Sequence, residues 1–193
     1  GLILPMTSQL LEKVIADLPK LADGQWVSVN IVATHLEHPH LRELLQQNDW
    51  PSPIRLTFEL TEREPIKDIK TAMGEITTLQ EKGYHIKLDD FGTGYGGFAY
   101  LQRLGIRQIK IDKMFVDTIG TDDLKRSVLD AIIAFGRKSG MEMIAEGVET
   151  QAQVDYLSEH GVYLIQGYVY AKPMSLSQLK IWQMAWSQSR AST

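Results

Sequence analysis

The 193-residue sequence contains no cysteine, which excludes disulfides, thiolate nucleophiles and cysteine-ligated zinc sites. It has no basic excess either. With 20 Lys and Arg against 24 Asp and Glu, the net charge of -4 argues against a protein that binds nucleic acid through its phosphates. There is no run of about 18 apolar residues that would span a bilayer, and the chain does not open on a cationic-then-apolar signal segment. A hydrophobic fraction of 44% is ample for one packed domain.

A short unit occurs four times along the chain: a helix end, a glycine, an apolar β-rich run and then a polar residue. The four copies read EKGYHIKLDD, RLGIRQIKID, KSGMEMIAEG and EHGVYLIQGY. Glycine is favoured just past a helix because it adopts the left-handed conformation without a steric penalty. Two earlier runs, 26–32 and 54–62, also have strand character, and helices are expected at 67–82 and 122–138. Six strands that alternate with helices predict an α/β fold with a parallel sheet.

Helical spacing of apolar residues predicts a buried face on each of the two long helices. The expected faces are Ile69, Ala72, Met73, Ile76 and Leu79 in the first, and Leu124, Val128, Ile132 and Phe135 in the second. The sequences TQAQ at 150–153 and SLSQ at 175–178 fit capping boxes that begin two further helices. The segment 98–104 predicts only one or two helical turns.

Polar side chains stand at or near the C-terminal ends of all six predicted strands. They are Asn30, Glu59, Asp89, Asp112, Glu146 and Gln166. In an open doubly wound sheet these ends would be strung along one edge, whereas in a (β/α)8 barrel they converge on one mouth, where active sites lie. The strand ends therefore favour a modified TIM barrel, of the (β/α)8 type. Six strands where a full barrel has eight predict that its N-terminal part lies outside this chain.

The acidic strand ends predict a site for a hard divalent cation. A single carboxylate after a strand is ordinarily a helix cap or a solvated loop residue, but several at one mouth repel each other unless a cation lies among them. Oxygen ligands without Cys or His favour Mg²⁺ or Mn²⁺. Asp89 and Asp90 would point to opposite faces of a regular strand. At a strand end that turns, they can serve two neighbouring ions, an arrangement that supports phosphoryl transfer.

The glycine-rich run that follows Asp90 has two interpretations. It fits G-x-G-x-x-G through Gly92, Gly94 and Gly97, and Asp112 lies 20 residues beyond Gly92, as in a dinucleotide-binding turn. However, carboxylates directly before the loop would repel a pyrophosphate, and the helix that follows is short. A glycine loop beside a metal-bound substrate is therefore the preferred interpretation.

Lys110 lies two residues before Asp112, so both side chains face the same way on a strand. Because burying an unpaired ammonium is costly, Lys110 is expected to pair with the acids or to orient a nucleophilic water. Gln166 could hold the same water. The alternatives are a plain ion pair between Lys110 and Asp112, and a surface amide at Gln166.

Five ordered motifs resemble those of the EAL domain family, which are cyclic-di-GMP phosphodiesterases with a modified TIM barrel: FELTERE, KLDDFGTGYGGFAYL, IKIDKMFV, AEGVET and QGYVYAKP. The resemblance runs from residue 1 to about 185, which makes 1–185 the domain and 186–193 a C-terminal tail. It implies hydrolysis of cyclic di-GMP to linear pGpG with two Mg²⁺ or Mn²⁺ ions, and a homodimer. It also implies a cytoplasmic location, either alone or below an upstream sensor or membrane domain.

The resemblance also implies a role for each matching position. The metal ligands would be Asn30, Glu59, Asp89, Asp90 and Glu146. The groups around the hydrolytic water would be Lys110 and Gln166, with Glu149 as a supporting acid. The family has a loop at its dimer interface, and Gly92, Thr93 and Gly94 would lie in this loop. Glu62 would anchor the loop. Asp112 would be the acid at the end of the strand that carries Lys110. Tyr168 and Pro173 would contact substrate.

Two features depart from the family pattern. The Glu-Ala-Leu motif is absent, which implies that one metal ligand and a substrate-binding arginine lie upstream. We therefore expect this chain alone to hydrolyse slowly, and to self-associate through a dimer face or across an open seam of the barrel. Gly96 and Gly97 replace residues that are commonly serine, which makes the loop more flexible.

Two other functional classes remain as alternatives. The first is a non-catalytic EAL-like receptor that binds cyclic di-GMP, and the presence of the metal-ligand set argues against it. The second is a Mg²⁺-dependent lyase or isomerase barrel with a lysine base, and the DDFGTGY run argues against it.

Overall fold

The computed structural model describes residues 2–61, 64–93 and 97–191. Within them, six parallel strands form one sheet in chain order. The strands are β1 (Val27–Ile31), β2 (Leu56–Thr61), β3 (His85–Phe91), β4 (Gln108–Ile111), β5 (Glu142–Ala145) and β6 (Leu164–Ile165). The helices are α1 (Ile3–Asp17), α2 (Ala33–Leu36), α3 (His40–Gln47), α4 (Ile69–Glu81), α5 (Gly97–Leu104), α6 (Lys113–Val116), α7 (Lys125–Lys138), α8 (Gln151–Glu159) and α9 (Leu176–Ala191), with 3₁₀ turns at Leu18–Lys20 and Pro53–Arg55.

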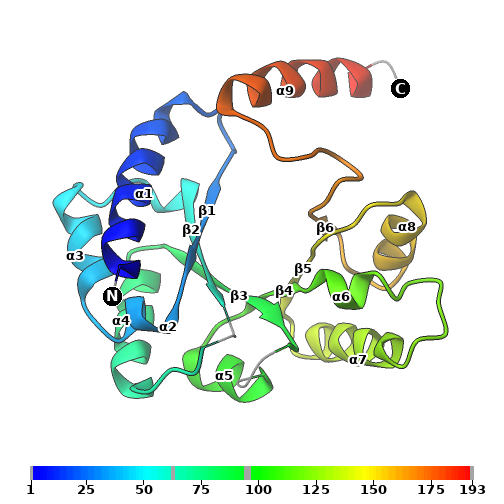
Figure 1. Cartoon of the computed structure of the whole chain (residues 1–193), viewed down its shortest axis with the longest axis horizontal. Helices are drawn as coiled ribbons and strands as arrows, with labels where there is room; N and C mark the ends of the chain where they lie inside the picture. Colours follow the sequence, from blue (N-terminus) through cyan, green and yellow to red (C-terminus); the bar gives the residue numbers. More distant parts are fainter. Residues whose placement is uncertain (1, 62–63, 94–96, 192–193) are drawn as a thin grey trace.

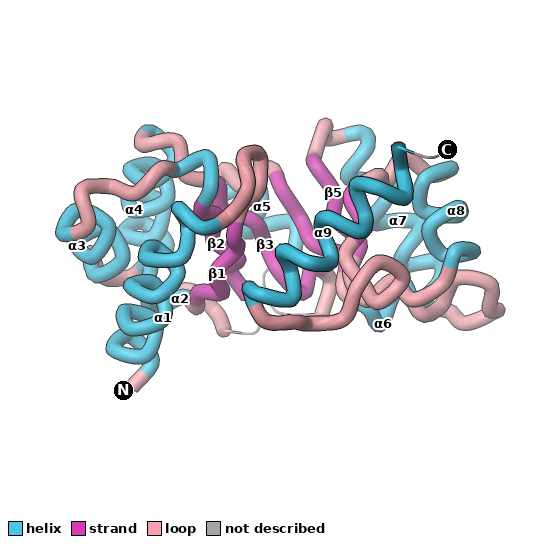
Figure 2. The backbone as a smooth tube through the Cα atoms, turned by 90° about the horizontal axis from the view of Figure 1, so that it is seen from above, coloured by secondary structure: helices cyan, strands magenta, loops and turns pink. Residues whose placement is uncertain are grey.

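The strand order decides between the two architectures that the sequence allows. A doubly wound sheet reverses its strand order at a switch point, whereas here each strand pairs in parallel with the next one along the chain. The strands curl into an arc with helices α1 to α8 on its convex side, and α9 lies on the open side (Figure 1). Viewed from above, the strands run side by side between two groups of helices (Figure 2). The prediction of a truncated TIM-type barrel is confirmed as a curled half-barrel.

The two faces of the sheet differ in chemistry. The outward side chains Phe58, Leu88 and Ile109 are fully buried against the helices and form the core. The inward side chains form a polar row that crosses the strands in register: Asn30, Glu59, Lys87, Gln108 and Glu142. A TIM barrel ordinarily fills its interior with branched apolar residues. Here a cavity of about 550 Å³ lies over the inward face and is lined in part by Glu59, Lys87 and Glu142.

The recurring glycine unit has the local structure that its sequence predicts. The four glycines, Gly83, Gly105, Gly140 and Gly161, all have φ between 64° and 89° and follow a helix. Both predicted capping boxes are present. Thr150 accepts a hydrogen bond from the backbone of Gln153, whose side chain accepts one in return, and Ser175 and Gln178 pair in the same way.

The predicted buried faces of the two long helices are wrong in part. Met73 in α4 and Val128 in α7 are exposed, and Leu124 precedes α7 and is 87% exposed. The buried face of α7 runs through Leu129, Ile132, Ile133 and Gly136. The apolar spacing alone did not fix the rotation of this helix, because neighbouring apolar positions offered two overlapping stripes.

A further observation concerns the end of the last helix. Helix α9 continues across position 185 to Ala191, so no break in secondary structure marks the predicted start of the tail.

Among the described residues, none of the helices has the length and apolar character that crossing a membrane requires.

Candidate metal centre

Asp89 and Asp90 lie at a local irregularity just before the last residue of strand β3, Phe91. The pairing of β3 with β4 shifts register between Leu88 and Phe91, and Asp90 has a φ of 55°, in the left-handed region that non-glycine residues rarely adopt. Thr93 donates its backbone N–H and its hydroxyl to the carbonyl oxygen of Asp90, at 3.1 and 2.8 Å. The strand therefore turns where the sequence prediction required it to turn.

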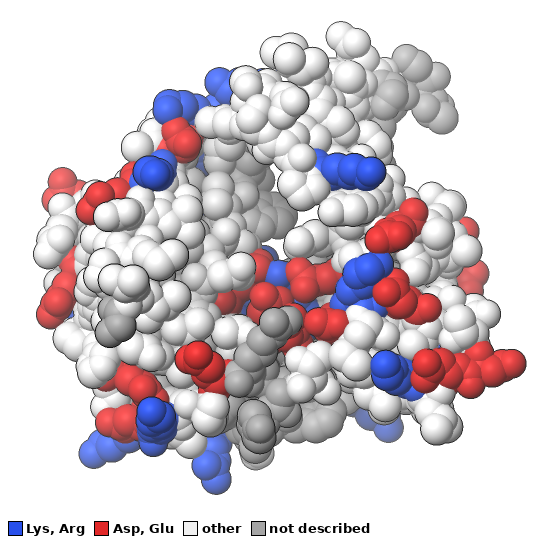
Figure 3. Space-filling view, in the orientation of Figure 1, with Lys and Arg blue, Asp and Glu red and all other residues white. Residues whose placement is uncertain are grey.

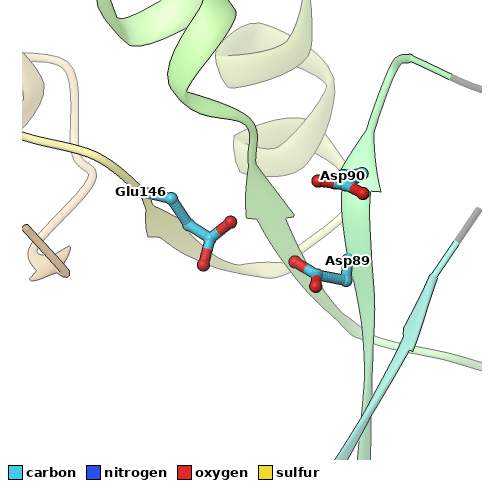
Figure 4. A group of neighbouring side chains, drawn as sticks. All are labelled: Asp89, Asp90 and Glu146. Carbon is cyan, nitrogen blue, oxygen red and sulfur yellow. The ribbon is translucent and has the colours of Figure 1, made fainter. Parts of the chain in front are cut away.

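The turn brings adjacent carboxylates to one site. Asp89, Asp90 and Glu146 each offer an oxygen, and these oxygens lie within 4.8 Å of one another. Figure 4 shows the three side chains converging from the ends of β3 and β5. The backbone of Glu146 is fixed because its N–H donates to the carbonyl of Ile111 at 3.0 Å. In the space-filling view, acidic side chains gather around basic ones at the hollowed centre of this face (Figure 3).

Lys110, on β4, lies at the centre of this acidic group. Its side chain is 3% exposed, and its Nζ lies 2.5 Å from Glu59 Oε2, 2.6 Å from Glu146 Oε1 and 3.1 Å from Asp89 Oδ1. Lys110 therefore pairs with the acids of the strand ends, which is one of the two roles expected for it. Asp112, the alternative partner, caps α6 by accepting a hydrogen bond from the N–H of Met114 at 2.6 Å.

The charges in this group do not balance, because three carboxylates face one ammonium. Burial by itself lowers the pKa of Lys110, but the hydrogen bonds to Glu146 and Glu59 outweigh it, so the pKa is raised and the side chain stays charged. Burial raises the pKa of Glu146, and Lys110 opposes this effect. Asp89 Oδ1 is buried and, among the described residues, accepts no well-directed hydrogen bond. A group of oxygen donors that carries more carboxylate than ammonium charge fits a hard divalent cation.

Asn30 and Gln166 flank the acidic group. Asn30 is exposed on β1 and lies opposite Glu59 in the strand register. The backbone of Gln166 donates to Ala145 at 2.8 Å and accepts from Val148 at 3.2 Å, which joins the loop after β6 to the loop after β5. At this crossing the backbones approach closely, since a Cβ on Gly167 would lie 2.0 Å from the carbonyl oxygen of Val148. The crossing therefore requires glycine.

The carboxylate of Glu149 is paired elsewhere. It lies 2.8 Å from Lys113 Nζ, and the same ammonium lies 2.9 Å from Asp117 and 3.3 Å from the carbonyl of Gly147. The proposed supporting role of Glu149 would therefore act through Lys113 and the loop that follows Glu146.

Tyr168 and Pro173 line a second cavity of about 560 Å³ beside the acidic group. Gln166 lines both cavities, so the two spaces adjoin. The ammonium of Lys172 lies 5.6 Å from the centre of the Tyr168 ring. An apolar space with an aromatic ring and a lysine next to a polar mouth suits a flat, charged ligand.

The loop residues are only partly described. Gly92 has a φ of 92°, and a Cβ there would lie 3.1 Å from the ring of Phe115. Thr93 stabilises the turn at Asp90, as given above. Glu62 and Gly94 lie outside the described residues, so their predicted roles remain predictions.

Sequence reasoning missed two lysines of this region. Lys87 is 6% exposed on the inward face, where burial lowers its pKa and its ammonium lies 5.8 Å from the Trp26 ring centre. The same two-residue spacing that singled out Lys110 before Asp112 places Lys87 before Asp89, so the signal was available. Lys113 had no such signal, because its partner Glu149 is 36 residues away.

The comparisons with known proteins concern the family and the fold. The EAL domain family model matches residues 1–173, and the structure of the PaMucR phosphodiesterase in complex with c-di-GMP superposes with a TM-score of 0.79. That match has 30% identity and covers 93% of this chain and 75% of the other. The fold is a parallel barrel-type sheet with acidic strand ends, and the chain belongs to the EAL domain family.

Two curated relatives from Escherichia coli K12 are close in sequence. The chain is 37% identical over 184 residues to the cyclic di-GMP phosphodiesterase PdeL, and 35% identical over 190 residues to the protein named "Probable cyclic di-GMP phosphodiesterase PdeG". The alignments cover 90% and 93% of this chain. The chain spans 50% of PdeL and 37% of PdeG.

Proposed function

We propose that this chain is the greater part of a metal-dependent domain that hydrolyses cyclic di-GMP to linear pGpG. The observation that carries the proposal is the convergence of Asp89, Asp90 and Glu146 at the strand ends of an EAL-family barrel. Relatives that match more than nine-tenths of this chain are named for this activity or solved with this nucleotide. The substrate and product are therefore inferred from the family together with the site.

The proposed ligands are Asn30, Glu59, Asp89, Asp90 and Glu146, which lie at the ends of four strands. We propose that they bind two ions, either Mg²⁺ or Mn²⁺, because adjacent acids at a turned strand end can each serve one ion. Bound divalent ions would supply charge stabilisation for the phosphoryl group and a more acidic water. The site itself needs no nitrogen or sulfur donor, which agrees with the preference of these ions for oxygen.

The other side chains have roles that follow from their positions. Lys110 and Gln166 are proposed to orient the attacking water, and Tyr168 and Pro173 to contact the nucleotide from the adjoining cavity. Water adds to one phosphorus of the cyclic dinucleotide, and the P–O bond to one ribose 3′ oxygen breaks. That oxygen takes up a proton, and the product is pGpG with a terminal 5′ phosphate. We further propose a homodimer through the loop that includes Gly92 and Thr93.

The direct test is hydrolysis of cyclic di-GMP, followed by chromatography, for the 193-residue chain and for a version extended upstream. We expect pGpG to form with Mg²⁺ or Mn²⁺, to stop with EDTA, and to form faster in the extended version. Asp89→Asn should reduce turnover by at least about a hundredfold, because it removes a charge from the group of acids.

Asp130→Asn is the matched control, because it removes one carboxylate from the outer surface, where Asp130 pairs with Arg126. It should leave turnover within about twofold of the parent. Turnover by Asp89→Asn close to that of the parent would refute the metal role. Nucleotide binding without any hydrolysis in either version would identify a receptor in place of an enzyme.

A further inference from the structure

The ammonium of Lys110 contacts the same carboxylates that the proposed metal site requires. Its Nζ lies 2.6 Å from Glu146 Oε1 and 3.1 Å from Asp89 Oδ1, and both residues belong to the group of three acids whose oxygens converge. A third contact, at 2.5 Å, goes to Glu59. Carboxylate oxygens that bind Mg²⁺ lie about 2.0–2.1 Å from it. An ammonium and a divalent cation held by the same carboxylates at such short distances repel each other strongly.

We propose that Lys110 is the built-in counter-ion of the metal-free site, and that metal binding is an exchange of one cation for another. In the metal-free protein, Lys110 holds Glu59, Asp89 and Glu146 together against their mutual repulsion. When a divalent cation binds these oxygens, Lys110 gives up its contacts with Asp89 and Glu146. The inference deepens the proposed function, because it rests on the acids being a metal site.

The burial of the group is what makes the exchange necessary. The side chain of Lys110 is 3% exposed, and those of Glu59, Asp89 and Glu146 are between 10% and 18% exposed, so solvent screens their charges poorly. Three close carboxylates in such surroundings repel each other strongly, and an internal cation relieves that repulsion. Lys110 therefore keeps the ligands in place, at the expense of metal affinity.

The exchange also gives a physical reason for coupling between metal and substrate. The lysine stem is flexible and its ammonium is a compact charge. Once displaced, the ammonium is repelled by the new cation and attracted by an anion at the mouth. A phosphate of the substrate is such an anion, so its binding would favour the displaced position of Lys110 and would thereby tighten metal binding. By linkage, bound metal would tighten substrate binding by the same factor.

The test is the affinity for Mn²⁺ alone, measured by titration calorimetry in the absence of nucleotide, for the parent chain and Lys110→Met. Removing the competing ammonium should tighten Mn²⁺ binding by at least about tenfold. Lys87→Met is the matched control, because Lys87 is also buried on the inward face and lies opposite Glu59 in the strand register. It removes the same charge, yet its ammonium is not among the contacts of Asp89 and Glu146 described above, so affinity should change by less than about threefold.

The outcomes separate the exchange from the proposed function. Equal or weaker Mn²⁺ binding by Lys110→Met, with clear binding by the parent, would overturn the exchange and leave the metal site intact. An equal gain in Lys87→Met would also overturn it, because the effect would then come from net charge alone. If the parent and both variants bind no Mn²⁺, the metal site itself is wrong, and the exchange falls with it.

A second measurement uses the unaltered protein and does not depend on the folding of a variant. In EDTA, the Lys110 ammonium should give a slowly exchanging ¹⁵N signal, because three carboxylates shield its protons; the signal is assigned by its absence from Lys110→Arg. Saturation with Mg²⁺, which is diamagnetic, should shift this signal or remove it through faster exchange. A signal that stays unchanged at saturating Mg²⁺ would overturn the exchange.

Discussion

The loop after β5 and the loop after β6 approach closely at Val148 and Gly167, and this close approach predicts the effect of Gly167→Ala. The added Cβ would lie 2.0 Å from the carbonyl oxygen of Val148 and 2.4 Å from its nitrogen. Real Cβ atoms essentially never approach another atom closer than 3.0 Å, so the two backbones must separate by about an ångström. Both are main chain, so no side chain can simply rotate away.

The magnitude follows from what the separation breaks. Val148 donates its N–H to Gln166 at 3.2 Å and accepts from Val169 at 3.0 Å, and both bonds cross between the loops. Losing two such bonds costs about 1–3 kcal/mol, and strain at the crossing adds to this. We expect a loss of roughly 2–4 kcal/mol in the free energy of unfolding, which for a chain of this size lowers Tm by about 4–16 °C. Because Glu146 and Gln166 lie on the two loops, hydrolysis should fall by at least about tenfold.

The matched control is Gly74→Ala in helix α4. A Cβ on Gly74 meets no atom within 4 Å, and the position is inside a helix, where alanine is favoured over glycine by about 0.5–1 kcal/mol. This substitution should raise Tm slightly and leave hydrolysis unchanged. The assays are urea unfolding, thermal melting and chromatographic detection of pGpG. A Gly167→Ala protein with the stability and turnover of the parent would refute the account of how this crossing holds the site.

Three further predictions concern pH and metal. A hydrogen bond from Tyr156 holds the pKa of Asp130 below its usual value. This bond therefore stabilises the fold above about pH 4, and its contribution is lost as the pH falls through the lowered pKa. In urea unfolding, Tyr156→Phe should lower the free energy of unfolding by up to about 1 kcal/mol at pH 7 and by less at pH 3.5. Burial raises the pKa of Glu75 despite its ion pair with Arg42 at 3.3 Å. Ionisation of Glu75 therefore weakens the fold as the pH rises above about 4.5. In urea unfolding, Glu75→Gln should have a higher free energy of unfolding than the parent at pH 7, by less than about 1 kcal/mol, and the difference should shrink on acidification. Mn²⁺ should raise the Tm of the parent but not that of Asp89→Asn, and an equal shift in both would place the metal elsewhere.

The repeated glycine unit explains why the fold was predictable from sequence. Each copy carries its own helix stop, a buried strand and a polar end, so local signals agree with the global barrel. The same repetition places Asp89 and Glu146 at equivalent strand ends, which is why their convergence follows from the pattern. The rotation of α7 did not follow, because Val128 and Leu129 are both apolar and only the packing of the helix decides that Leu129 is the buried one.

The details of the site depend on long-range geometry that spacing does not carry. The sequence shows that Lys110 faces inward, but its distances to Glu59 and Glu146 depend on how strongly the sheet curls between β2 and β5. The sequence predicted a turn at Asp89 and Asp90, but it did not predict that Asp90 itself adopts the left-handed conformation. The pairing of Lys113 with Glu149 joins two loops that are neighbours only because β4 and β5 pair in parallel.

Ile109 and Lys110 show that one face of this sheet forms the apolar core and the other carries the charged site. They are adjacent on β4 and point to opposite faces, Ile109 into the apolar core and Lys110 into the acidic group. Because helices cover the outer face and bury it fully, the core does not need apolar side chains on the inner face. The inner face is thus free to carry charged residues across several strands, which an ordinary barrel interior could not do without loss of packing. Charge in the lumen is therefore stabilised by pairing, and a lumen lysine such as Lys110 can exchange partners without disturbing the core one residue away.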